Sequence, residues 1–519
     1  MINIIIYLHD IEHTNFQLKS IPVLHFNIQS ILDSHGFGNK NDYQNIYINL
    51  YNSLKEAIID KTLQEGLKLP PTRVLANDIK ISRSTVIKAY ELLVLDNYVK
   101  CINGSGYYVS SSKNTKIHFN LKSVNSFKHY PTISKKGNAF QKNIHLINNT
   151  QSSSEIAFKP GLPPLDIFPT NIWRNLSNSY WGGIKSSELS YSKSIGLQCL
   201  RENISNYLKI YRNITCNASE IIITTGSLHS LYLIGNALID KGDKVLTENM
   251  TYPHAYRLFK SLQAKVSQID LNNTELAFGN FKNNLAKFIY TIPSNQNFLG
   301  NKLSMPKRLE LLQWASINGA LIIEDDYEQE FSNWNKPLAA IYSLDRQDRV
   351  IYLGTFNKLL HPSIRLGYMI VPNYLQNTIL NIIEQSSRFV SPELQKVMSM
   401  FIEKDYLNKH IRNIVAIAQE RKELFMEHFI SNFGDEIVLD SSSTGLNILG
   451  KFKNSNVSDQ DVSAYLKQKG IITNPLSKYY ISKPLENGLV MGYSCVNNKL
   501  IKQSISKMKN EYSNFLKLN

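Results

Sequence analysis

Two apolar segments in the C-terminal half of the chain end in residues that could do chemistry. Residues 321–323 run directly into three acids, of which Asp325 is the second, and Lys358 follows the apolar run 350–353, 33 positions after Asp325. A buried strand that ends in acids is costly unless a cation or a ligand meets the carboxylates. A lysine amine can form a Schiff base with a carbonyl compound. Taken alone, each feature is also compatible with a solvated loop.

Two further segments could hold the other parts of a bound cofactor. Residues 221–228, IIITTGSL, are typical of a strand that enters a helix through small residues, which presents backbone amides to an anion. Tyr252 follows another apolar run and could place its ring over a ligand, although a simple turn and a core tyrosine are the alternatives. Pyridoxal phosphate (PLP) requires a lysine, a carboxylate that keeps its ring nitrogen protonated, an aromatic lid and a phosphate cup. All four together predict a PLP site.

The elements that must position these residues alternate after Pro160 between helical patterns and short apolar runs. Short apolar runs bounded by polar clusters are typical of buried parallel strands in an α/β sheet. Ligands of such sheets bind at the carboxyl ends of the strands, where the acids and the lysine stand. The predicted strands are residues 221–223, 244–246, 288–290, 321–323 and 350–353.

A smaller region between positions 46 and 110 predicts a helix-turn-helix. We expect Thr72 to cap a first helix and Ser82 or Ser84 to cap a second, with Lys80 and Ile81 forming the turn between them. The side chains expected to face the core are Val74, Leu75 and Ile79 from the first helix and Val86, Ala89 and Tyr90 from the second.

The start of the second helix is polar and basic, as in a recognition helix that meets base edges and phosphates, and two glycines then allow a hairpin wing. Through IYINLYNSLKEAI, LPPTRVLA, ISRSTVIKAYELL and NGSGYYV, residues 47–109 resemble the GntR-type winged helix. Cys101 and Ile102 stand where relatives often carry a basic residue before the wing. The predicted DNA-binding residues are Arg73, Ser82, Arg83, Ser84, Thr85, Lys88, Gly104 and Gly106.

The C-terminal motifs also stand in the order of a known family. GLPPLDIFP, LSYSKSIGLQCLRENISNYL, IIITTGSLHSLYL, TIPSNQNFLG, LIIEDDYEQEF, VIYLGTFNKLLHPSIRLGYMIVP and NPLSKYY resemble the fold type I aminotransferase domain of the MocR-type (GabR- and PdxR-like) subfamily of GntR transcription regulators. This resemblance implies a multi-domain protein, with an N-terminal winged helix-turn-helix and a C-terminal α/β PLP-dependent transferase fold.

Carried over by position, the resemblance assigns roles to the candidate residues. Lys358 would form the Schiff base with PLP, Asp325 would pair with the pyridine nitrogen, Tyr327 would bond the phenolic oxygen and Tyr252 would stack on the ring. The phosphate would be held by Gly226, Ser227, Leu228 and Arg365, and by Tyr191 reaching from the neighbouring subunit; Asn295 or Asn297 would lie near an oxygen of the cofactor.

Several positions depart from this family. Aminotransferases of this fold usually place an arginine in the C-terminal subdomain to clamp the substrate carboxylate, and residues 488–494 contain none. His254 stands where sensors of γ-aminobutyrate can carry an arginine, and Asn357 replaces the common serine before the lysine. The segment PSNQNFLG replaces the usual PSHQ. The missing arginine favours regulation over catalysis.

Composition limits the partners and the architecture. A net charge of +15 over 519 residues favours a polyanion or an acidic membrane surface as partner, and no stretch approaches the length of a membrane span. The four cysteines lack metal-ligand or disulfide spacing, so we expect no metal site and a cytoplasmic location. The predicted layout is an N-terminal extension without an assigned role (1–45), a winged helix (46–110), a basic polar linker (111–155) and an aminotransferase-like PLP-binding effector and dimerisation domain (156–519).

Three functions are compatible with this layout. The first is a transcription regulator that senses PLP or a small amino compound and binds operator DNA as a homodimer, domain-swapped if the linker docks each winged helix onto the partner. The second is a catalytically active aminotransferase that carries a DNA-binding domain. The third is a DNA-binding protein whose aminotransferase fold is only a dimerisation scaffold, which is disfavoured because all four requirements of PLP are met.

Overall fold

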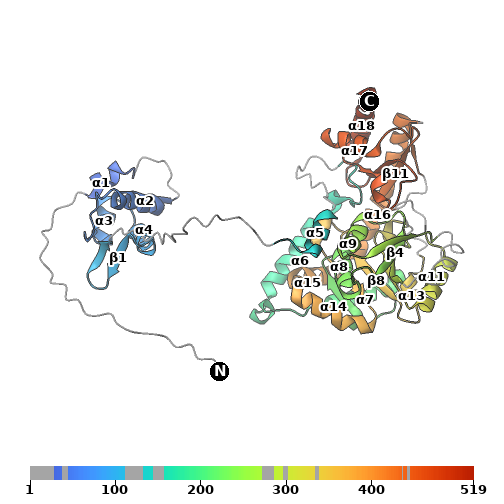
Figure 1. Cartoon of the computed structure of the whole chain (residues 1–519), viewed down its shortest axis with the longest axis horizontal. Helices are drawn as coiled ribbons and strands as arrows, with labels where there is room; N and C mark the ends of the chain where they lie inside the picture. Colours follow the sequence, from blue (N-terminus) through green and yellow to red (C-terminus); the bar gives the residue numbers. More distant parts are fainter. Residues whose placement is uncertain are drawn as a thin grey trace. The chain divides into compact units, whose positions relative to one another are not determined.

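The computed structural model divides into two compact units, residues 1–131 and residues 132–519 (Figure 1). The structure describes residues 28–37, 45–110, 132–143, 157–271, 286–295, 302–332, 338–434, 436–440 and 445–518. Within these ranges, no helix is long and apolar enough to cross a membrane, and no group of three or more His, Cys, Asp or Glu side chains could hold a metal ion.

The smaller unit is a helix-turn-helix followed by a two-stranded antiparallel wing. The wing pairs residues from Val99 opposite Val109 to Ile102 opposite Gly106. Gly104 has φ of 78° in the tight turn, a conformation that glycine adopts without steric cost. The elements are α1 (Ile28–Ser34), α2 (Ile46–Ile59), α3 (Thr72–Asp78), α4 (Arg83–Leu95), β1 (Val99–Ile102) and β2 (Gly106–Val109).

The predicted core of this unit is largely confirmed. The three predicted residues of α4 are fully buried, as is Leu75 of α3, and Ile79 packs against the same core. The prediction for Val74 is wrong, because this side chain is 43% exposed and Ala76 is buried instead. The short helix α3 turns its Leu75–Ala76 face inward, so a position one residue earlier faces outward.

One predicted helix cap is confirmed and the other is wrong. The Ser82 hydroxyl accepts a hydrogen bond from the Thr85 backbone N–H at 3.1 Å, so Ser82 caps α4. Pro71, not Thr72, precedes α3, and no side chain caps that helix. The Thr72 hydroxyl instead accepts a hydrogen bond from Arg83 Nε at 3.4 Å, which joins the two helices across the turn.

Helix α1 belongs to the core of the smaller unit. Ile28 and Leu32 are buried in that core, and the His35 ring nitrogen Nε2 lies 2.6 Å from the Asp60 carboxylate at the end of α2. The predicted N-terminal extension, 1–45, had no assigned role. Its helix α1 therefore belongs to the winged-helix unit.

The larger unit is built on a seven-stranded sheet in the order β3-β9-β8-β7-β6-β4-β5. All five predicted strands are present, whereas β5 and β9 were not predicted. Strands β5, β4, β6, β7 and β8 pair in parallel, and β9 runs antiparallel to both of its neighbours. The carboxyl ends of β3, β4, β7 and β8 therefore meet at one edge. The strands are β3 (Ile221–Thr224), β4 (Lys244–Glu248), β5 (Lys265–Ile269), β6 (Ala286–Thr291), β7 (Leu321–Asp325), β8 (Val350–Thr355) and β9 (Gly367–Ile370).

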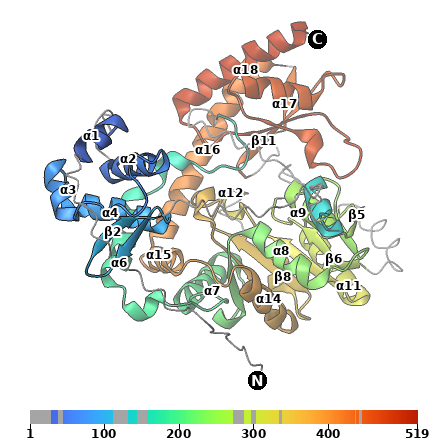
Figure 2. The same ribbon diagram turned by 60° about the vertical axis from the view of Figure 1, so that its left-hand side comes forward.

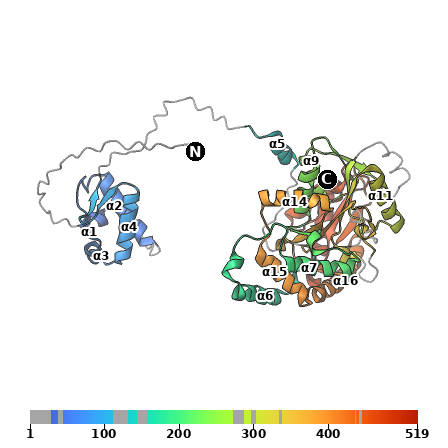
Figure 3. The same ribbon diagram turned by 90° about the horizontal axis from the view of Figure 1, so that it is seen from below.

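Helices cover both faces of this sheet, which explains why its strands are apolar on both sides. Along β3, Ile221 and Ile223 pack into one core with α7 and α15, and Ile222 packs into the other core with α8, α9 and α14. Figure 3 shows α7 and α15 side by side. The helices are α6 (Thr170–Gly183), α7 (Gln198–Arg212), α8 (Ser227–Leu238), α9 (Pro253–Ser261), α11 (Met305–Asn318), α12 (Gln329–Ser332), α13 (Ile341–Leu344), α14 (Asn373–Ser386) and α15 (Pro392–Glu403), with short 3-10 turns η2 (Leu165–Ile167), η3 (Ser186–Leu189), η4 (Ala218–Glu220), η5 (Pro362–Ile364) and η6 (Leu476–Tyr479).

The long helix α16 (Tyr406–Phe433) leads into a C-terminal subdomain. Phe425, Phe429 and Phe433 stack at a spacing of four residues, with ring centroids 5.4 and 4.3 Å apart. Helices α17 (Asp459–Gln468) and α18 (Asn498–Leu518) share a core with this end of α16 and with an antiparallel sheet (Figure 2). That sheet has the order β10-β11-β13-β12, formed by β10 (Ile437–Leu439), β11 (Asn447–Phe452), β12 (Asn474–Pro475) and β13 (Gly488–Gly492).

Helix α5 (Lys135–Lys142) lies within the stretch predicted as a linker. Phe140 packs against the core under α8 and α9, with its ring 6.5 Å from that of Tyr232. Lys136 Nζ donates a hydrogen bond to the Asn236 side chain at 3.2 Å. The chain that leads from the winged helix is thus attached to two helices that begin at candidate cofactor residues.

Candidate cofactor site and DNA-binding surface

Lys358 lies three residues beyond the end of β8, at the edge where the strand ends meet. Its Nζ donates a hydrogen bond to the Gly161 carbonyl at 2.6 Å and lies 3.5 Å from Glu328 Oε1. The lysine side chain is 28% exposed, so ligands can reach it from solvent. Gly161 has φ of 70°, which favours glycine, and a Cβ there would stand 2.4 Å from Nζ, so a larger residue would displace the lysine amine.

Asp325 is the last residue of β7 and is 1% exposed. Its Oδ2 accepts a hydrogen bond from the Tyr290 hydroxyl at 2.8 Å, and the Ser227 side chain also bonds the carboxyl group. Oδ1 has no hydrogen-bond partner among the described residues. Burial raises the pKa of Asp325 to about 7, against the lowering effect of these hydrogen bonds and of the Lys358 charge. A cationic N–H donor would therefore stabilise the ionised form of this buried carboxyl group.

The turn between β3 and α8 forms a cup. Gly226 adopts φ of 112° before the first turn of α8, where free backbone N–H groups and the helix dipole favour an anion. A Cβ at Gly226 would stand 2.9 Å from Asn357 Nδ2 and 3.8 Å from the Arg365 guanidinium nitrogens. The structure therefore brings Gly226, Ser227, Leu228 and Arg365 together, with Asn357 added to the predicted set.

Two tyrosines flank the same edge. Tyr252 precedes α9, and Tyr327 follows β7 with its ring centroid 6.0 Å from Lys358 Nζ. Burial raises the pKa of both phenols. The charge of Asp325 raises the pKa of Tyr252 further, and the charge of Arg365 lowers it. Both phenols are therefore neutral near pH 7.

The remaining predicted cofactor residues have different surroundings. Asn295 is fully buried, and a Cβ on Gly445 would stand 2.7 Å from its Nδ2 and 2.5 Å from Glu328 Oε2. Asn297 lies outside the described residues. Tyr191 is 78% exposed, and its ring contacts Arg388 and Phe389. Within one chain, Tyr191 thus faces outward.

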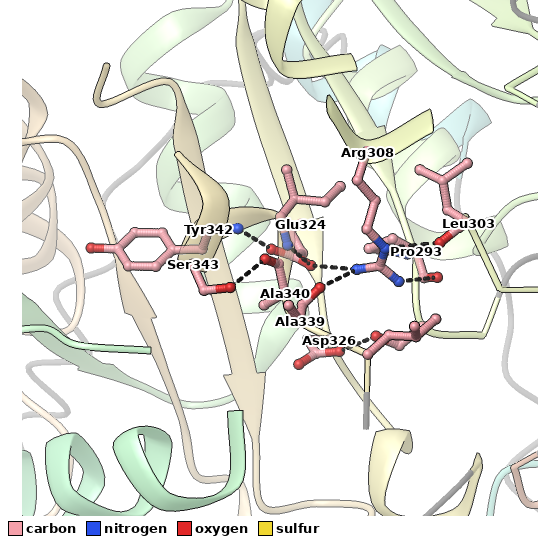
Figure 4. A network of polar contacts seen from close by, with 12 residues as sticks. Pro293, Leu303, Arg308, Glu324, Asp326, Ala339, Ala340, Tyr342 and Ser343 are labelled. Carbon is pink, nitrogen blue, oxygen red and sulfur yellow. Dashed lines mark hydrogen bonds and ion pairs between the residues drawn. The ribbon is translucent and has the colours of Figure 1, made fainter. Parts of the chain in front are cut away.

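Buried arginines that the sequence analysis missed hold the two acids on either side of Asp325. Arg308 Nη1 lies 3.7 Å from Glu324 Oε1 and donates to the Ala339 carbonyl at 3.0 Å (Figure 4). Arg212 Nε donates to Asp326 Oδ2 at 2.6 Å. Each arginine lies on the buried face of its helix, α7 or α11, among mostly apolar residues. An arginine at such a position is the one sequence signal that could have indicated these pairs.

The winged helix presents most of its predicted DNA-binding residues to solvent. Arg73, Ser82, Arg83, Ser84, Lys88 and Gly104 are exposed, and Thr85 and Gly106 are partly exposed. Lys88 Nζ lies 5.6 Å from the centroid of the Tyr47 ring, and Lys68 Nζ lies 5.6 Å from that of Tyr108 on the wing. Tyr47 and Lys68 border this surface, although the sequence analysis did not select them.

The site at the strand ends fits PLP. The unpaired Oδ1 of Asp325 can accept a hydrogen bond from a protonated pyridine nitrogen, and the glycine cup can receive the phosphate. Lys358 lies close enough to Asp325 for its charge to lower the pKa of that carboxyl group. Amine, carboxyl group, neutral aromatic rings and anion cup therefore share one edge of the sheet.

The chain is similar to known regulators over most of its length and to a solved aminotransferase over three quarters of it. The chain is 27% identical to the probable rhizopine catabolism regulatory protein MocR of Rhizobium meliloti over 463 residues, covering 89% of this chain and 93% of that protein. It is 26% identical to the uncharacterized HTH-type transcriptional regulator YhdI of Bacillus subtilis, covering 93% and 99%. The structure of LysN, an α-aminoadipate aminotransferase from Thermus thermophilus, matches with a TM-score of 0.67 at 20% identity, covering 75% of this chain and 98% of LysN.

Family comparison identifies the two parts. Residues 46–109 match bacterial regulatory proteins of the gntR family. Residues 169–489 match aminotransferases of class I and II, which is more than half of the chain. The chain therefore belongs to the class I and II aminotransferase family and carries a GntR-type winged helix at its N-terminal end.

Proposed function

We propose that this protein is a PLP-dependent transcription regulator of the MocR type, which reads the state of its PLP site and changes its binding to operator DNA. The observation that carries the proposal is the presence in one chain of an exposed recognition helix and a buried carboxyl group with one free oxygen beside a lysine. Relatives named as regulators match nearly the whole chain, which supports the same function.

In this proposal the chain's own residues hold the cofactor and leave it open to an amine. Lys358 would attach PLP, Asp325 would keep the ring nitrogen protonated, and the cup that begins at Gly226 would bind the phosphate. When bound, PLP supplies a carbonyl carbon that reacts with amines. A small amino compound, or PLP itself, is the proposed effector.

The proposed DNA contacts lie at the start of α4 and on the wing. Arg83 and Lys88 would meet bases and phosphates from the recognition helix, while Gly104 and Gly106 would let the wing approach the minor groove. The protein would act as a cytoplasmic homodimer, with the exposed Tyr191 reaching the phosphate site of the second subunit. Helix α5 would then connect each winged helix to the cofactor site, since α5 packs against α9.

An active aminotransferase with a DNA-binding domain is the second candidate, because the site fits PLP. The buried residues of β13 oppose this function, since that strand offers only apolar side chains where the resemblance expects an arginine. Without such a clamp, the substrate carboxylate is poorly oriented for loss of the Cα proton.

The test combines DNA binding with a measurement of turnover. We expect DNA binding that weakens steeply with salt, and transamination of a panel of amino donors with 2-oxo acids far below the roughly 1 to 1,000 per second of ordinary enzymes. Turnover in that range, without specific DNA binding, would favour the enzyme.

A further inference from the structure

We propose that Glu328 selects the ligand amine, and that this ligand carries a second ammonium group in place of a carboxylate. The inference deepens the proposed function, because it concerns the amino compound that the same site binds. Glu328 follows Tyr327 directly and occupies a left-handed backbone conformation with φ of 62°. It is 2% exposed, although an isolated glutamate side chain is rarely buried.

The Glu328 carboxylate has one satisfied oxygen and one that lacks a hydrogen bond. Oε2 accepts a hydrogen bond from the Leu446 backbone N–H at 3.1 Å. Oε1 has no hydrogen-bond partner among the described residues, and the nearby cation is Lys358 Nζ at 3.5 Å. A buried carboxylate is costly unless a cation or donors compensate it, so this lysine is its electrostatic partner.

Cofactor attachment through Lys358 changes this balance. Once the lysine nitrogen is bound to PLP, it no longer serves as the ammonium partner of Glu328. A neutral ligand amine that takes its place on PLP would release Lys358 as a neutral amine, because the proton stays on the new imine nitrogen, so Glu328 would still lack a cationic partner. The carboxylate remains at the junction of β7, the Gly161 loop and Gly445, with Oε1 within 3.9 Å of where a Cβ on Gly161 would stand. A ligand ammonium that reaches Oε1 would restore the missing charge pair and gain a charge-assisted hydrogen bond.

In the described part of the chain, strand β13 and Tyr493 offer no cation to a ligand carboxylate. Strand β13, on the C-terminal side, is buried and contributes no charged residue between Gly488 and Gly492. The Tyr493 hydroxyl already donates to the Gly445 carbonyl at 2.6 Å. A carboxylate close to Glu328 would therefore meet a like charge, whereas an ammonium would meet a partner.

The experiment compares three ligands of equal chain length on the full-length, PLP-loaded protein. They are 1,4-diaminobutane, n-butylamine and 4-aminobutyrate, whose far ends are cationic, neutral and anionic. Affinity is measured by calorimetry and by the change in visible absorbance. We expect the diamine to bind about tenfold more tightly than butylamine, as a charged hydrogen bond allows, and 4-aminobutyrate to bind most weakly.

Variants assign the preference to Glu328. Glu328→Gln should bind the diamine and butylamine within about threefold of each other and keep its PLP absorbance, and Glu328→Asp should keep part of the preference. Glu486→Gln is the matched control, because this partly exposed acid pairs with Lys451 at 2.7 Å on the C-terminal subdomain. A diamine that binds less than about threefold more tightly than butylamine, stronger binding of 4-aminobutyrate, or a preference kept by Glu328→Gln would each overturn the inference. Loss of PLP binding by the wild-type protein would instead contradict the proposed function.

Discussion

Three consecutive buried acids at the end of β7 are satisfied in different ways. Glu324 accepts the backbone N–H groups of Ile341 and Tyr342 at 2.9 Å, and Asp326 pairs with the buried Arg212. Asp325 alone among the three keeps an oxygen without a hydrogen-bond partner in the described part of the chain. A fully satisfied acid stabilises the fold, whereas an incompletely satisfied one is available to a ligand. This difference, which could not be predicted from the sequence, distinguishes the proposed ligand-binding acid, Asp325, from its neighbours.

The raised pKa of Asp325 predicts how the free energy of unfolding of the PLP-free protein depends on pH. Because burial raises this pKa from 3.8 to about 7, the folded protein keeps a proton that the unfolded chain releases. The contribution of Asp325 to stability therefore falls as pH rises from about 4 to 7, by at most about 1.4 kcal/mol per pH unit, and is constant above that range. Asp325→Asn should gain stability relative to wild type over this range, as measured by chemical unfolding of the PLP-free proteins. Equal pH profiles for both proteins would contradict the assignment.

Lys358→Ala should lose the visible absorbance of bound PLP. The amine beside Asp325 is the proposed attachment point, and alanine cannot form the bond. The spectrum of the purified variant after incubation with PLP provides the measurement, and Lys404→Ala on the surface is the control. Retention of the wild-type band would show that another lysine holds PLP.

The strands that carry the site could be predicted where a short run of apolar residues marked them. Short apolar runs predicted the buried strands β3, β4, β6, β7 and β8, because both faces of each are covered. Strand β5 was missed because it lies at the edge of the sheet and three of its five residues, KVSQI, are polar. Strand β9 follows the lysine motif closely and runs antiparallel, which a repeated βαβ pattern does not predict. Glu328 and Arg212 could not be assigned, since their importance depends on contacts between distant segments.

At the level of α4, Arg83→Ala should selectively weaken binding to operator DNA. Arg83 is the first residue of the recognition helix, directly after the Ser82 cap, where side chains reach base edges. Losing a good base contact costs about 1 to 3 kcal/mol of discrimination, with a smaller effect on random DNA. Fluorescence anisotropy with both DNAs measures the ratio, and Lys61→Ala at the end of α2 is the control. An equal loss on both DNAs would limit Arg83 to phosphate contacts.

The whole molecule combines two separately folded units, and its proposed signal requires a connection between them. Helix α5 is attached to α8 through Lys136 and Asn236, and α8 begins at the proposed phosphate cup. A ligand can change DNA binding only if it binds the DNA-competent arrangement with a different affinity from the others. The contacts of α5 are therefore where we expect that difference to be transmitted.

We expect the full-length protein to be a homodimer. Tyr191 and Trp181 are 78% and 53% exposed, and large aromatic side chains with this exposure are candidates for burial by a second subunit. Sedimentation velocity at micromolar concentration measures the mass, and Tyr191→Ala should weaken PLP binding without removing Lys358. A monomeric wild-type protein that binds PLP fully would exclude a role for the second subunit.

The most direct test of the central claim is the affinity for operator DNA with and without PLP. The target DNA is selected from random sequence with the PLP-loaded protein, and affinity is then measured for the wild type and Lys358→Ala at one salt concentration. The account predicts that PLP changes the affinity of the wild type by about 5-fold to 150-fold, the range typical of allosteric coupling, and leaves that of Lys358→Ala unchanged. Equal wild-type affinity in both states would contradict regulation through this site.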